Sequence, residues 1–140
     1  MHYYLSLGSN LGDRETTLRK ALQQIEQQIG HVTRCSSFFY SEPWGFESPN
    51  SFCNLCCAVE TTMQPMDVLN ATQAIERALG RNHKSVEGQY SDRPIDIDII
   101  RAFDDEQKEI VSNSPLLTIP HPLYQQRPFV LIPLQEISGE

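Results

Sequence analysis

The chain has 140 residues, a formal net charge of −7 and a sequence pI near 5.0. A chain of this length fits one domain and can bury roughly two thirds of its unfolded surface, so it needs neither disulfides nor a structural metal to form a core. No apolar run approaches the roughly 20 residues of a membrane span, and the acidic balance argues against a general nucleic-acid binder.

Residues 2–7 (HYYLSL) predict a first strand, and the GSNLGD that follows has the residues of turns and helix starts. Apolar residues then recur at helical spacing from Leu18 to Ile29, which predicts a helix ended by Gly30. The β-branched and aromatic residues of 32–40 predict a second strand. The segment SEPWGFESPNS, with two prolines and a glycine, then predicts a long loop.

Residues 52–62 predict a third strand, and Pro65 begins a second predicted helix that runs to Leu79 and ends at Gly80. The polar segment RNHKSVEGQYSD lacks apolar periodicity and predicts a second long loop, a kind of segment that is often functional. DRPIDIDII then predicts a strand and FDDEQKE a solvated turn. A short strand is predicted near residues 110–111, and PFVLIPL predicts a last strand flanked by prolines.

The order strand, helix, strand, strand, helix, strand predicts an α+β fold of the ferredoxin-like, split βαβ type (βαββαβ), in which two helices cover one face of an antiparallel sheet. Extra strands after residue 105 would form a C-terminal strand extension. No linker or repeat divides the chain, so residues 1–140 are expected to form a single domain. A ligand would lie on the helix-free face of the sheet, near the two long loops.

Four cysteines stand at positions 35, 53, 56 and 57, and Cys53 with Cys56 has the CxxC spacing of zinc and redox sites. A zinc site needs about four converging ligands, and no second CxxC or HxxxH follows. Residues i and i+3 of a strand also point to opposite faces. We therefore expect small, buried apolar side chains in a reducing compartment.

Asp96 and Asp98 alternate with Ile95, Ile97 and Ile99 in DRPIDIDII. A period of two sends the isoleucines toward a core and both carboxylates to the other face, roughly 6.5 Å apart along the strand. Neighbouring carboxylates repel each other unless a cation, a proton or an arginine neutralises them. On this spacing alone two interpretations remain open: the solvated face of an edge strand, or a site for hard divalent cations, which prefer oxygen ligands.

Basic and imidazole side chains lie on both sides of this strand in the sequence: Arg81, His83, Lys84, Arg93, His121 and Arg127. Carboxylates that hold a metal beside cations that reach phosphate oxygens would form a polyphosphate site. Each basic residue alone could equally form a surface ion pair worth about 0–1 kcal/mol. The chain has no GxxxxGK[ST] sequence, so Gly8 in GSNLG is interpreted as turn chemistry rather than as part of a phosphate loop.

Phe52 and Asn54 follow the first long loop, two positions apart and hence on the same face of the predicted strand. An aromatic ring beside an amide that both donates and accepts hydrogen bonds could hold a flat heterocycle. Core packing of Phe52 with a turn-capping Asn54 is the open alternative.

Five segments occur together in the order of a known family: LGSNLGDR, PWGFESPNSFCN, TQAIERALGR, DRPIDIDII and PHPLYQQRPFVLIPL. By these motifs nearly the whole chain resembles the 6-hydroxymethyl-7,8-dihydropterin pyrophosphokinases of folate biosynthesis. Members of this family transfer pyrophosphate from ATP to the hydroxymethyl group of the pterin and release AMP. The resemblance implies an ATP-dependent diphosphotransferase that uses ATP as co-substrate and two Mg²⁺ ions.

The resemblance also implies roles for individual residues. The implied catalytic set is Arg81, Arg93, Asp96 and Asp98, of which the two aspartates would be the metal ligands. The implied pterin contacts are Ser41, Pro43, Trp44, Phe52, Asn54 and Phe129, with the pterin between the two phenylalanine rings. The implied ATP contacts are Gln73, Glu76, Arg81, His83, Tyr90, Arg93, Ile99, Thr118, His121 and Arg127.

The chain departs from the family pattern at three places. His83 stands where relatives commonly carry arginine, Tyr90-Ser91-Asp92 where they carry Trp-Gly-Pro, and Leu116 where some carry an arginine that contacts ATP. The first two departures predict a different closed conformation of the second long loop and a different contact with the nucleotide. Leu116 leaves one fewer phosphate or ribose contact.

Two other functions suit the same fold: a non-catalytic module that binds a metabolite or metal, and a hydrolase of a phosphorylated substrate. The paired aspartates beside Arg93 favour the transferase, because a sensor has no need of a two-metal carboxylate pair facing cations. The expected partners are small-molecule substrates, ATP and the hydroxymethyl-dihydropterin, without nucleic acid or membrane. No segment of signal-peptide type begins the chain, so we expect a soluble, cytoplasmic protein. A monomer is expected.

Overall fold

The computed structural model describes residues 1–42, 51–80 and 94–139. Its elements in chain order are β1 (His2–Ser9), α1 (Arg14–Gln28), β2 (His31–Cys35), β3 (Phe39–Ser41), β4 (Phe52–Glu60), α2 (Pro65–Ala78), β5 (Asp96–Phe103), β6 (Ser112–Asn113), β7 (Thr118–Ile119), the 3₁₀ turn η2 (Tyr124–Gln126) and α3 (Pro128–Ser138).

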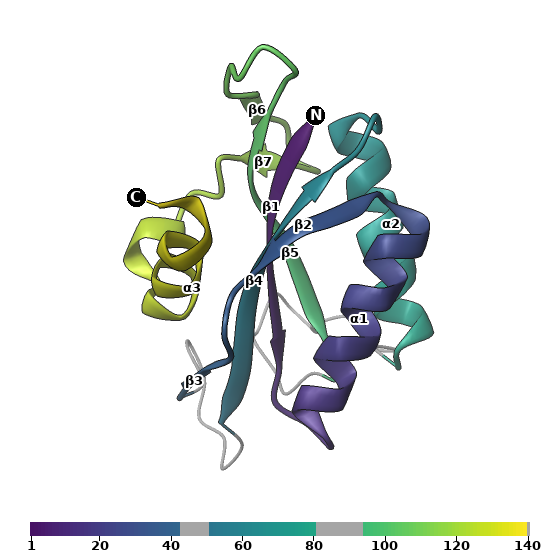
Figure 1. The fold of residues 1–140 in the computed structure, drawn as a ribbon, viewed down its shortest axis with the longest axis vertical. Coiled ribbons are helices and arrows are strands. Elements are labelled where there is room, and N and C mark those ends of the chain that lie inside the picture. The colour runs from purple at the N-terminus through teal and green to yellow at the C-terminus, as the bar shows by residue number, and fades with distance from the viewer. Residues whose placement is uncertain (43–50, 81–93, 140) are drawn as a thin grey trace.

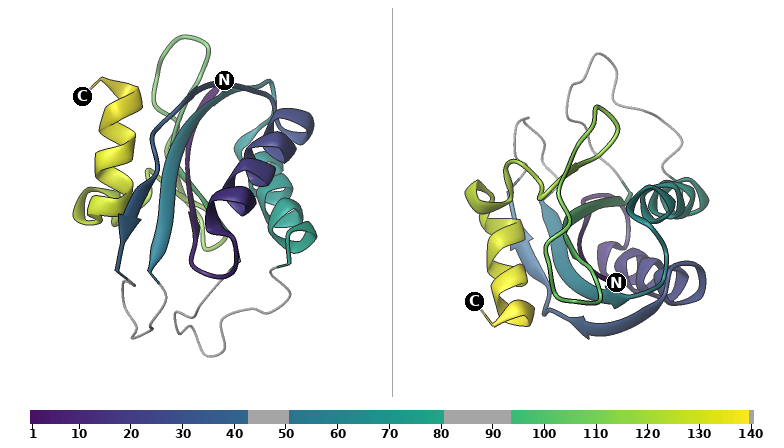
Figure 2. Two further views of the ribbon diagram at one scale, coloured as in Figure 1. Left: turned by 60° about the horizontal axis from the view of Figure 1, so that its bottom comes forward. Right: turned by 90° about the horizontal axis from the view of Figure 1, so that it is seen from above.

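One antiparallel sheet organises the molecule, in the strand order β2-β4-β1-β5, with β3 also paired to β4. Helices α1 and α2 cover one face of this sheet, and α3 lies against the opposite face (Figures 1 and 2). Strands β6 and β7 form a separate two-stranded sheet after β5. The predicted α+β fold with an antiparallel sheet is therefore confirmed.

Local sequence signals explain where α1 and α2 begin. The Asp13 carboxylate accepts a hydrogen bond from the Thr16 backbone N–H at 3.1 Å, and this bond lowers the pKa of Asp13 and caps the first turn of α1. Pro65 opens α2, as predicted, because its missing N–H has no partner in a first helical turn anyway. Gly30 lies just beyond the C-cap of α1, as predicted, and its N–H donates to the Ile25 carbonyl at 3.1 Å. A Cβ at Gly30 would also lie 2.2 Å from the Glu60 carbonyl oxygen, so only glycine permits this approach to β4.

The predicted strand at PFVLIPL is wrong, because this segment lies in α3. Pro128 occupies the first helical position, and Val130, Leu134 and Ile137 recur at helical spacing and pack on the sheet. A short apolar run fits a strand and a buried helix equally well, and here the spacing of the buried residues favours the helix. The face opposite α1 and α2 is consequently not helix-free, since α3 covers part of it (Figure 2).

Residues 32–40 form two strands, β2 and β3, and not the single strand that was predicted. The break lies at Ser36, whose backbone N–H donates to the Cys56 carbonyl at 2.8 Å while its side-chain oxygen accepts from the Cys56 N–H at 2.9 Å. The serine side chain thus replaces a regular strand contact.

Two apolar clusters lie on the two faces of the sheet. The larger one, under α1 and α2, contains the fully buried Leu5, Leu7 and Ile25 together with Ile97 and Ile99. The smaller one, under α3, contains Cys56, Ala58, Ile100, Val130, Leu134 and Ile137. A β-bulge between Tyr4 and Leu5 shifts the register with β5, and Ile100 accordingly joins the second cluster. Among the described residues no helix has the length and apolarity to span a bilayer.

The cysteines follow the prediction with one exception. Cys53, Cys56 and Cys57 are buried, and Cys53 and Cys56 belong to clusters on opposite faces of the sheet, which excludes a shared CxxC site. Burial raises the pKa of the Cys56 thiol to about 12. Cys35 is exposed, so the expectation of burial is wrong for this residue.

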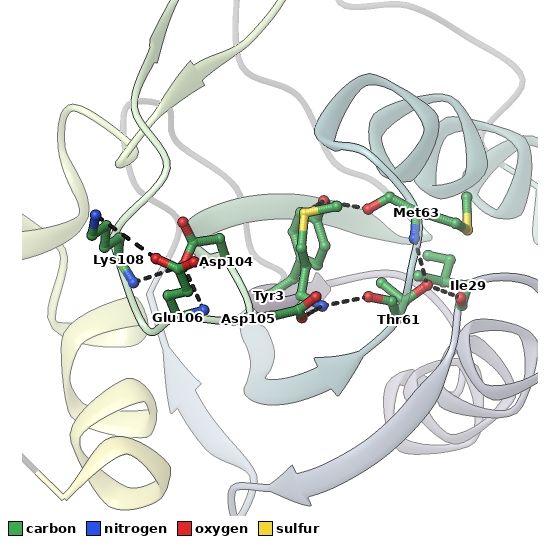
Figure 3. A network of polar contacts seen from close by, with 9 residues as sticks. Tyr3, Ile29, Thr61, Met63, Asp104, Asp105, Glu106 and Lys108 are labelled. Carbon is green, nitrogen blue, oxygen red and sulfur yellow. Dashed lines mark hydrogen bonds and ion pairs between the residues drawn. The ribbon is translucent and has the colours of Figure 1, made fainter.

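A polar network fixes the end of the sheet where β1 begins (Figure 3). The Met1 amino group donates to the Thr61 carbonyl at 2.7 Å and to Asp105 at 2.8 Å, and the Tyr3 hydroxyl donates to the Met63 carbonyl at 2.6 Å. Burial raises the pKa of Tyr3 to about 12, with a smaller contribution from Asp67. This network lies roughly 20 Å from the opposite end of β1, where the candidate site begins.

Candidate active site

The register of β4, β1 and β5 places three predicted site residues, Asn54, Asp96 and Asp98, in two rows across the sheet. Gly8 of β1 lies between Asn54 of β4 and Asp96 of β5, and Ser6 lies between Cys56 and Asp98. Directly paired residues of an antiparallel sheet point to the same face, and successive strands lie about 4.8 Å apart. Asn54 and Asp96 therefore flank Gly8 on the face that carries α3.

Gly8 leaves the space between these flanking residues open. A Cβ at this position would lie 3.0 Å from the Asn54 side-chain oxygen and 3.5 Å from the nearest ring carbon of Phe52. Gly8 lies within β1 and not in a turn, so its interpretation as turn chemistry is wrong. Its function is to admit the Asn54 and Phe52 side chains over the strand.

The Asn54 amide is buried and held in one orientation. Its nitrogen donates to the Phe39 carbonyl at 3.0 Å and to the Ser41 hydroxyl oxygen at 2.8 Å, which uses both of its hydrogens. The amide oxygen is thereby directed over Gly8 and can accept a hydrogen bond. This geometry disfavours the turn-capping alternative and leaves Asn54 able to read a donor group on a ligand.

The half-buried Phe52 lies beside Asn54, and its backbone is paired with Ser41 of β3. Phe129, the second residue of α3, packs against the smaller apolar cluster, with the Arg127 guanidinium carbon 5.9 Å from its ring centre. The two rings thus belong to β4 and α3, which are in contact. The aromatic sandwich remains a prediction.

Asp96 and Asp98 are half-buried, on the face opposite the buried Ile97 and Ile99. The outer edge of β5 is covered: the Ile97 N–H donates to the Glu76 carboxylate at 2.8 Å, and the Ile100 carbonyl accepts from the His121 N–H at 2.8 Å. A solvated edge strand would leave such groups to water. This cover favours the cation-site interpretation of the aspartate pair.

Arg127 and Asp96 lie close enough to His121 to shift its pKa. Burial lowers the pKa of His121 most, the positive charge of Arg127 lowers it further, and Asp96 opposes both. The Leu123 N–H donates to Nδ1 of His121 at 3.2 Å, which places the proton of the neutral ring on Nε2. His121 is therefore a neutral hydrogen-bond donor near pH 7, beside a buried arginine.

The remaining predicted ATP contacts occupy different surroundings. Gln73 is exposed on α2, whereas Glu76 is buried and bonded to the backbone of β5 between the two aspartates. The Ile99 side chain lies in the core under α1 and α2, so only its backbone is available on the site face. Thr118 is exposed in β7, two positions from the exposed Leu116. Six predicted site residues lie outside the described residues: Pro43, Trp44, Arg81, His83, Tyr90 and Arg93.

The described residues supply a donor set that suits Mg²⁺. They contain no group of three or more His, Cys, Asp or Glu side chains that could hold a metal, so a site here would rest on the two carboxylates. Mg²⁺ is commonly bound by one or two carboxylates together with substrate phosphates and water. Asp96 and Asp98 fit that role, whereas a zinc site would need more protein ligands.

Comparison with known proteins identifies relatives along the whole chain. The family model described as 7,8-dihydro-6-hydroxymethylpterin-pyrophosphokinase matches residues 4–139. A 2-amino-4-hydroxy-6-hydroxymethyldihydropteridine pyrophosphokinase of Porphyromonas gingivalis is 47% identical over 135 residues, covering 96% of this chain and 89% of that protein. The enzyme of that name from Bacillus subtilis is 39% identical over 138 residues, covering 98% of this chain and 78% of the relative.

Longer proteins contain a similar region. The folic acid synthesis protein fol1 of Schizosaccharomyces pombe is 38% identical over 98% of this chain, which spans 18% of that protein. Among solved structures, an HPPK-DHPS in complex with substrates matches with a TM-score of 0.72 at 15% identity, over 97% of this chain and 40% of the solved chain. A Plasmodium falciparum HPPK-DHPS matches with a TM-score of 0.69 over 96% of this chain and 39% of its own. These structures support the fold.

Proposed function

Because the chain belongs to the 7,8-dihydro-6-hydroxymethylpterin-pyrophosphokinase family, we propose that it transfers pyrophosphate from ATP to the hydroxymethyl group of 6-hydroxymethyl-7,8-dihydropterin in folate biosynthesis. The products are the pterin diphosphate and AMP. One observation supports the site assignment: the strand register aligns Asn54, Gly8 and Asp96 across one face of the sheet. In this proposal the pterin and the phosphates of ATP bind side by side on that face.

The pterin binds at the Asn54 end. The amide oxygen of Asn54 accepts a hydrogen bond from an N–H on the edge of the ring, because both amide hydrogens are already held by Phe39 and Ser41. Phe52 and Phe129 hold the two faces of the ring, and Ser41, Pro43 and Trp44 contact it further. The two phenylalanine rings hold the faces of the pterin, and the fixed Asn54 oxygen holds its edge. Together they orient the hydroxymethyl group toward Asp96.

The nucleotide binds at the aspartate end. Asp96 and Asp98 hold two Mg²⁺ ions, which when bound screen the charge on the phosphate oxygens. His121 donates from Nε2, and Arg127, Arg81 and Arg93 supply positive charge to the phosphates. The other proposed nucleotide contacts are Gln73, Glu76, His83, Tyr90, the Ile99 backbone and Thr118.

The reaction is a displacement at the β-phosphorus of ATP. The pterin hydroxyl oxygen forms a bond to this phosphorus, the bond from phosphorus to the oxygen it shares with the α-phosphate breaks, and AMP leaves with that electron pair. The hydroxyl proton passes to solvent, since no described side chain is placed as an evident base. Such transfers depend mainly on positioning and electrostatics. Closure over the substrates would exclude water and prevent hydrolysis of ATP.

Product analysis tests this proposal directly. Purified protein incubated with ATP, Mg²⁺ and 6-hydroxymethyl-7,8-dihydropterin should release AMP in step with pterin diphosphate, both identified by mass. Release of inorganic phosphate would instead indicate a hydrolase, and no pterin-dependent AMP would contradict the assignment. We further propose that the protein acts as a cytoplasmic monomer, which sedimentation at increasing concentration tests for the oligomeric state.

A further inference from the structure

Arg14, the first residue of α1, reaches the start of β4 beside the proposed pterin site. Its Nη1 donates to the Ser51 carbonyl oxygen at 3.0 Å and to the Ser51 hydroxyl oxygen at 2.8 Å. Ser51 directly precedes Phe52. Hydrogen bonds from a charged guanidinium are stronger than neutral ones, so this contact holds the Ser51 backbone firmly.

The same guanidinium also contacts β3. Its central carbon lies 5.3 Å from the ring centre of Tyr40, and the Tyr40 hydroxyl donates to the Glu15 carboxylate at 3.2 Å. Glu15 lies 3.7 Å from the Arg14 guanidinium in turn. We call Arg14, Glu15, Tyr40 and Ser51 the Arg14 clamp. It ties the first turn of α1 to both β3 and β4.

The clamp lies on the helix side of the strands, whereas the pterin residues lie on the other side. Tyr40 pairs with Cys53, and Cys53 belongs to the core under α1 and α2. Ser41, Phe52 and Asn54 alternate with these residues and thus face the opposite side. The clamp consequently grips the back of the two strand ends whose front carries the proposed pterin contacts.

Strand pairing alone gives this corner of the sheet limited support. The pairing of β1 with β4 ends at Ser9 and Cys53, one residue short of Phe52. The partner of Phe52 is Ser41, the last residue of the three-residue strand β3. Arg14 adds a second anchor at Ser51, two residues beyond the end of the β1 ladder.

We infer that Arg14 is a positioning residue that sets the affinity for the pterin and leaves the affinity for the nucleotide largely unchanged. This inference rests on the proposed function. Loss of the clamp frees the Ser51 backbone, which changes the placement of the Phe52 ring and of Ser41. Asp96 and Asp98 lie on β5, and His121 follows β7. Within the described part of the chain, the clamp contacts none of these three residues.

The chain contains a matched control for this substitution. Arg19, also on α1, places its guanidinium carbon 5.3 Å from the ring centre of Phe38, the same distance as between Arg14 and Tyr40. Phe38 belongs to the connection between β2 and β3, 13 residues before Ser51 in the sequence. Arg19→Ala therefore removes a comparable charge and ring contact from the same helix without touching the start of β4.

The experiment measures binding by calorimetry for wild type, Arg14→Ala, Arg14→Lys and Arg19→Ala, with melting temperatures recorded in parallel. One titration uses 6-hydroxymethyl-7,8-dihydropterin in the presence of Mg²⁺ and a non-hydrolysable ATP analogue, and the other uses the analogue alone. Arg14→Ala should weaken pterin binding about tenfold, the loss expected when a charge-assisted contact is removed, while the analogue binds as in wild type. Arg14→Lys should recover part of the loss, and Arg19→Ala should bind both ligands normally.

A companion cycle with Ser51→Ala and the double variant should show a combined loss smaller than the sum, because both substitutions act on one contact. The inference is overturned if Arg14→Ala binds the pterin as wild type does, loses both ligands equally, or is matched by Arg19→Ala. If Arg14→Ala does not fold, Arg14→Lys and Ser51→Ala carry the same comparison. Failure of wild type to bind the pterin at all would count against the proposed function and not against the role of Arg14 alone.

Discussion

Alternate residues of the same strands form the two faces of the central sheet, and the two faces have different roles. On the face under α1 and α2, Leu5 and Leu7 are fully buried and Ile97 is 5% exposed. On the other face α3 covers an apolar patch at one end, and Asn54, Asp96 and Asp98 occupy the other. A side chain's position in the alternation therefore predicts whether its loss affects stability or chemistry.

Asp96→Asn should produce the largest effect on the site face. Loss of one carboxylate removes a proposed metal ligand, and kcat/KM should fall by about 10³-fold, equivalent to about 4 kcal/mol of transition-state stabilisation. The free energy of unfolding should change far less than turnover, because asparagine keeps the size and shape of this half-buried side chain. AMP release measured over a range of Mg²⁺ concentrations tests the loss of turnover, and thermal denaturation tests the effect on stability. Near-normal turnover at moderate Mg²⁺ would contradict the role of Asp96 as a metal ligand.

Ile97→Ala, at the position next to Asp96 on β5, should affect stability and not chemistry. Truncation of this buried side chain under α1 and α2 should lower the free energy of unfolding by about 3 kcal/mol, measured by urea denaturation. Ile97→Val is the matched control and should lower it by about 1 kcal/mol. Activity per folded molecule should exceed that of Asp96→Asn for both variants. An Ile97→Ala protein that is stable but inactive would break the division between the two faces.

The sequence predicts much of this division but not all of it. Period-two alternation in DRPIDIDII correctly assigns Ile95, Ile97 and Ile99 to one cluster, because that pattern is local. The sequence alone could not predict the helix at Pro128–Ser138. A short apolar run fits two periodicities, and only contact with the sheet decides between them.

The role of Gly8 was missed for a related reason. Its requirement for glycine comes from Asn54 and Phe52 of a strand distant in sequence, and a single chain carries no local signal for such a contact. The orientation of the Asn54 amide likewise depends on Phe39 and Ser41 of another strand. The sequence shows which residue types are present, but it does not show which residues of different strands lie beside one another.

Gly8→Ala tests the site face where no polar group is changed. The added methyl group would lie 3.0 Å from the Asn54 oxygen, so the amide or the Phe52 ring must move. We expect pterin affinity to fall by about 1–2 kcal/mol, roughly 5- to 30-fold, with little change in nucleotide affinity. Because alanine suits a strand better than glycine, the melting temperature should change little. Equal losses of pterin and nucleotide would contradict the separation of the two ends of the site.

The smallest expected effect is the pH dependence that His121 adds to stability. Burial and Arg127 lower its pKa below the ordinary value, so the unfolded chain takes up this proton more readily than the folded one. The stability that His121 contributes is therefore fully present above about pH 6.5, its ordinary pKa, and is lost as the pH falls below that value toward the lowered folded pKa. His121→Asn keeps an acceptor in the place of Nδ1 for the Leu123 N–H but cannot be protonated, so its melting temperature should fall less than that of wild type between pH 7 and pH 5.

The coupling to Asp96 can be measured separately by NMR titration of the metal-free protein. Asp96 raises the pKa of His121, so Asp96→Asn should lower that pKa further. An unchanged His121 titration in Asp96→Asn would mean that the nucleotide-side imidazole and the aspartate pair do not share one electrostatic site.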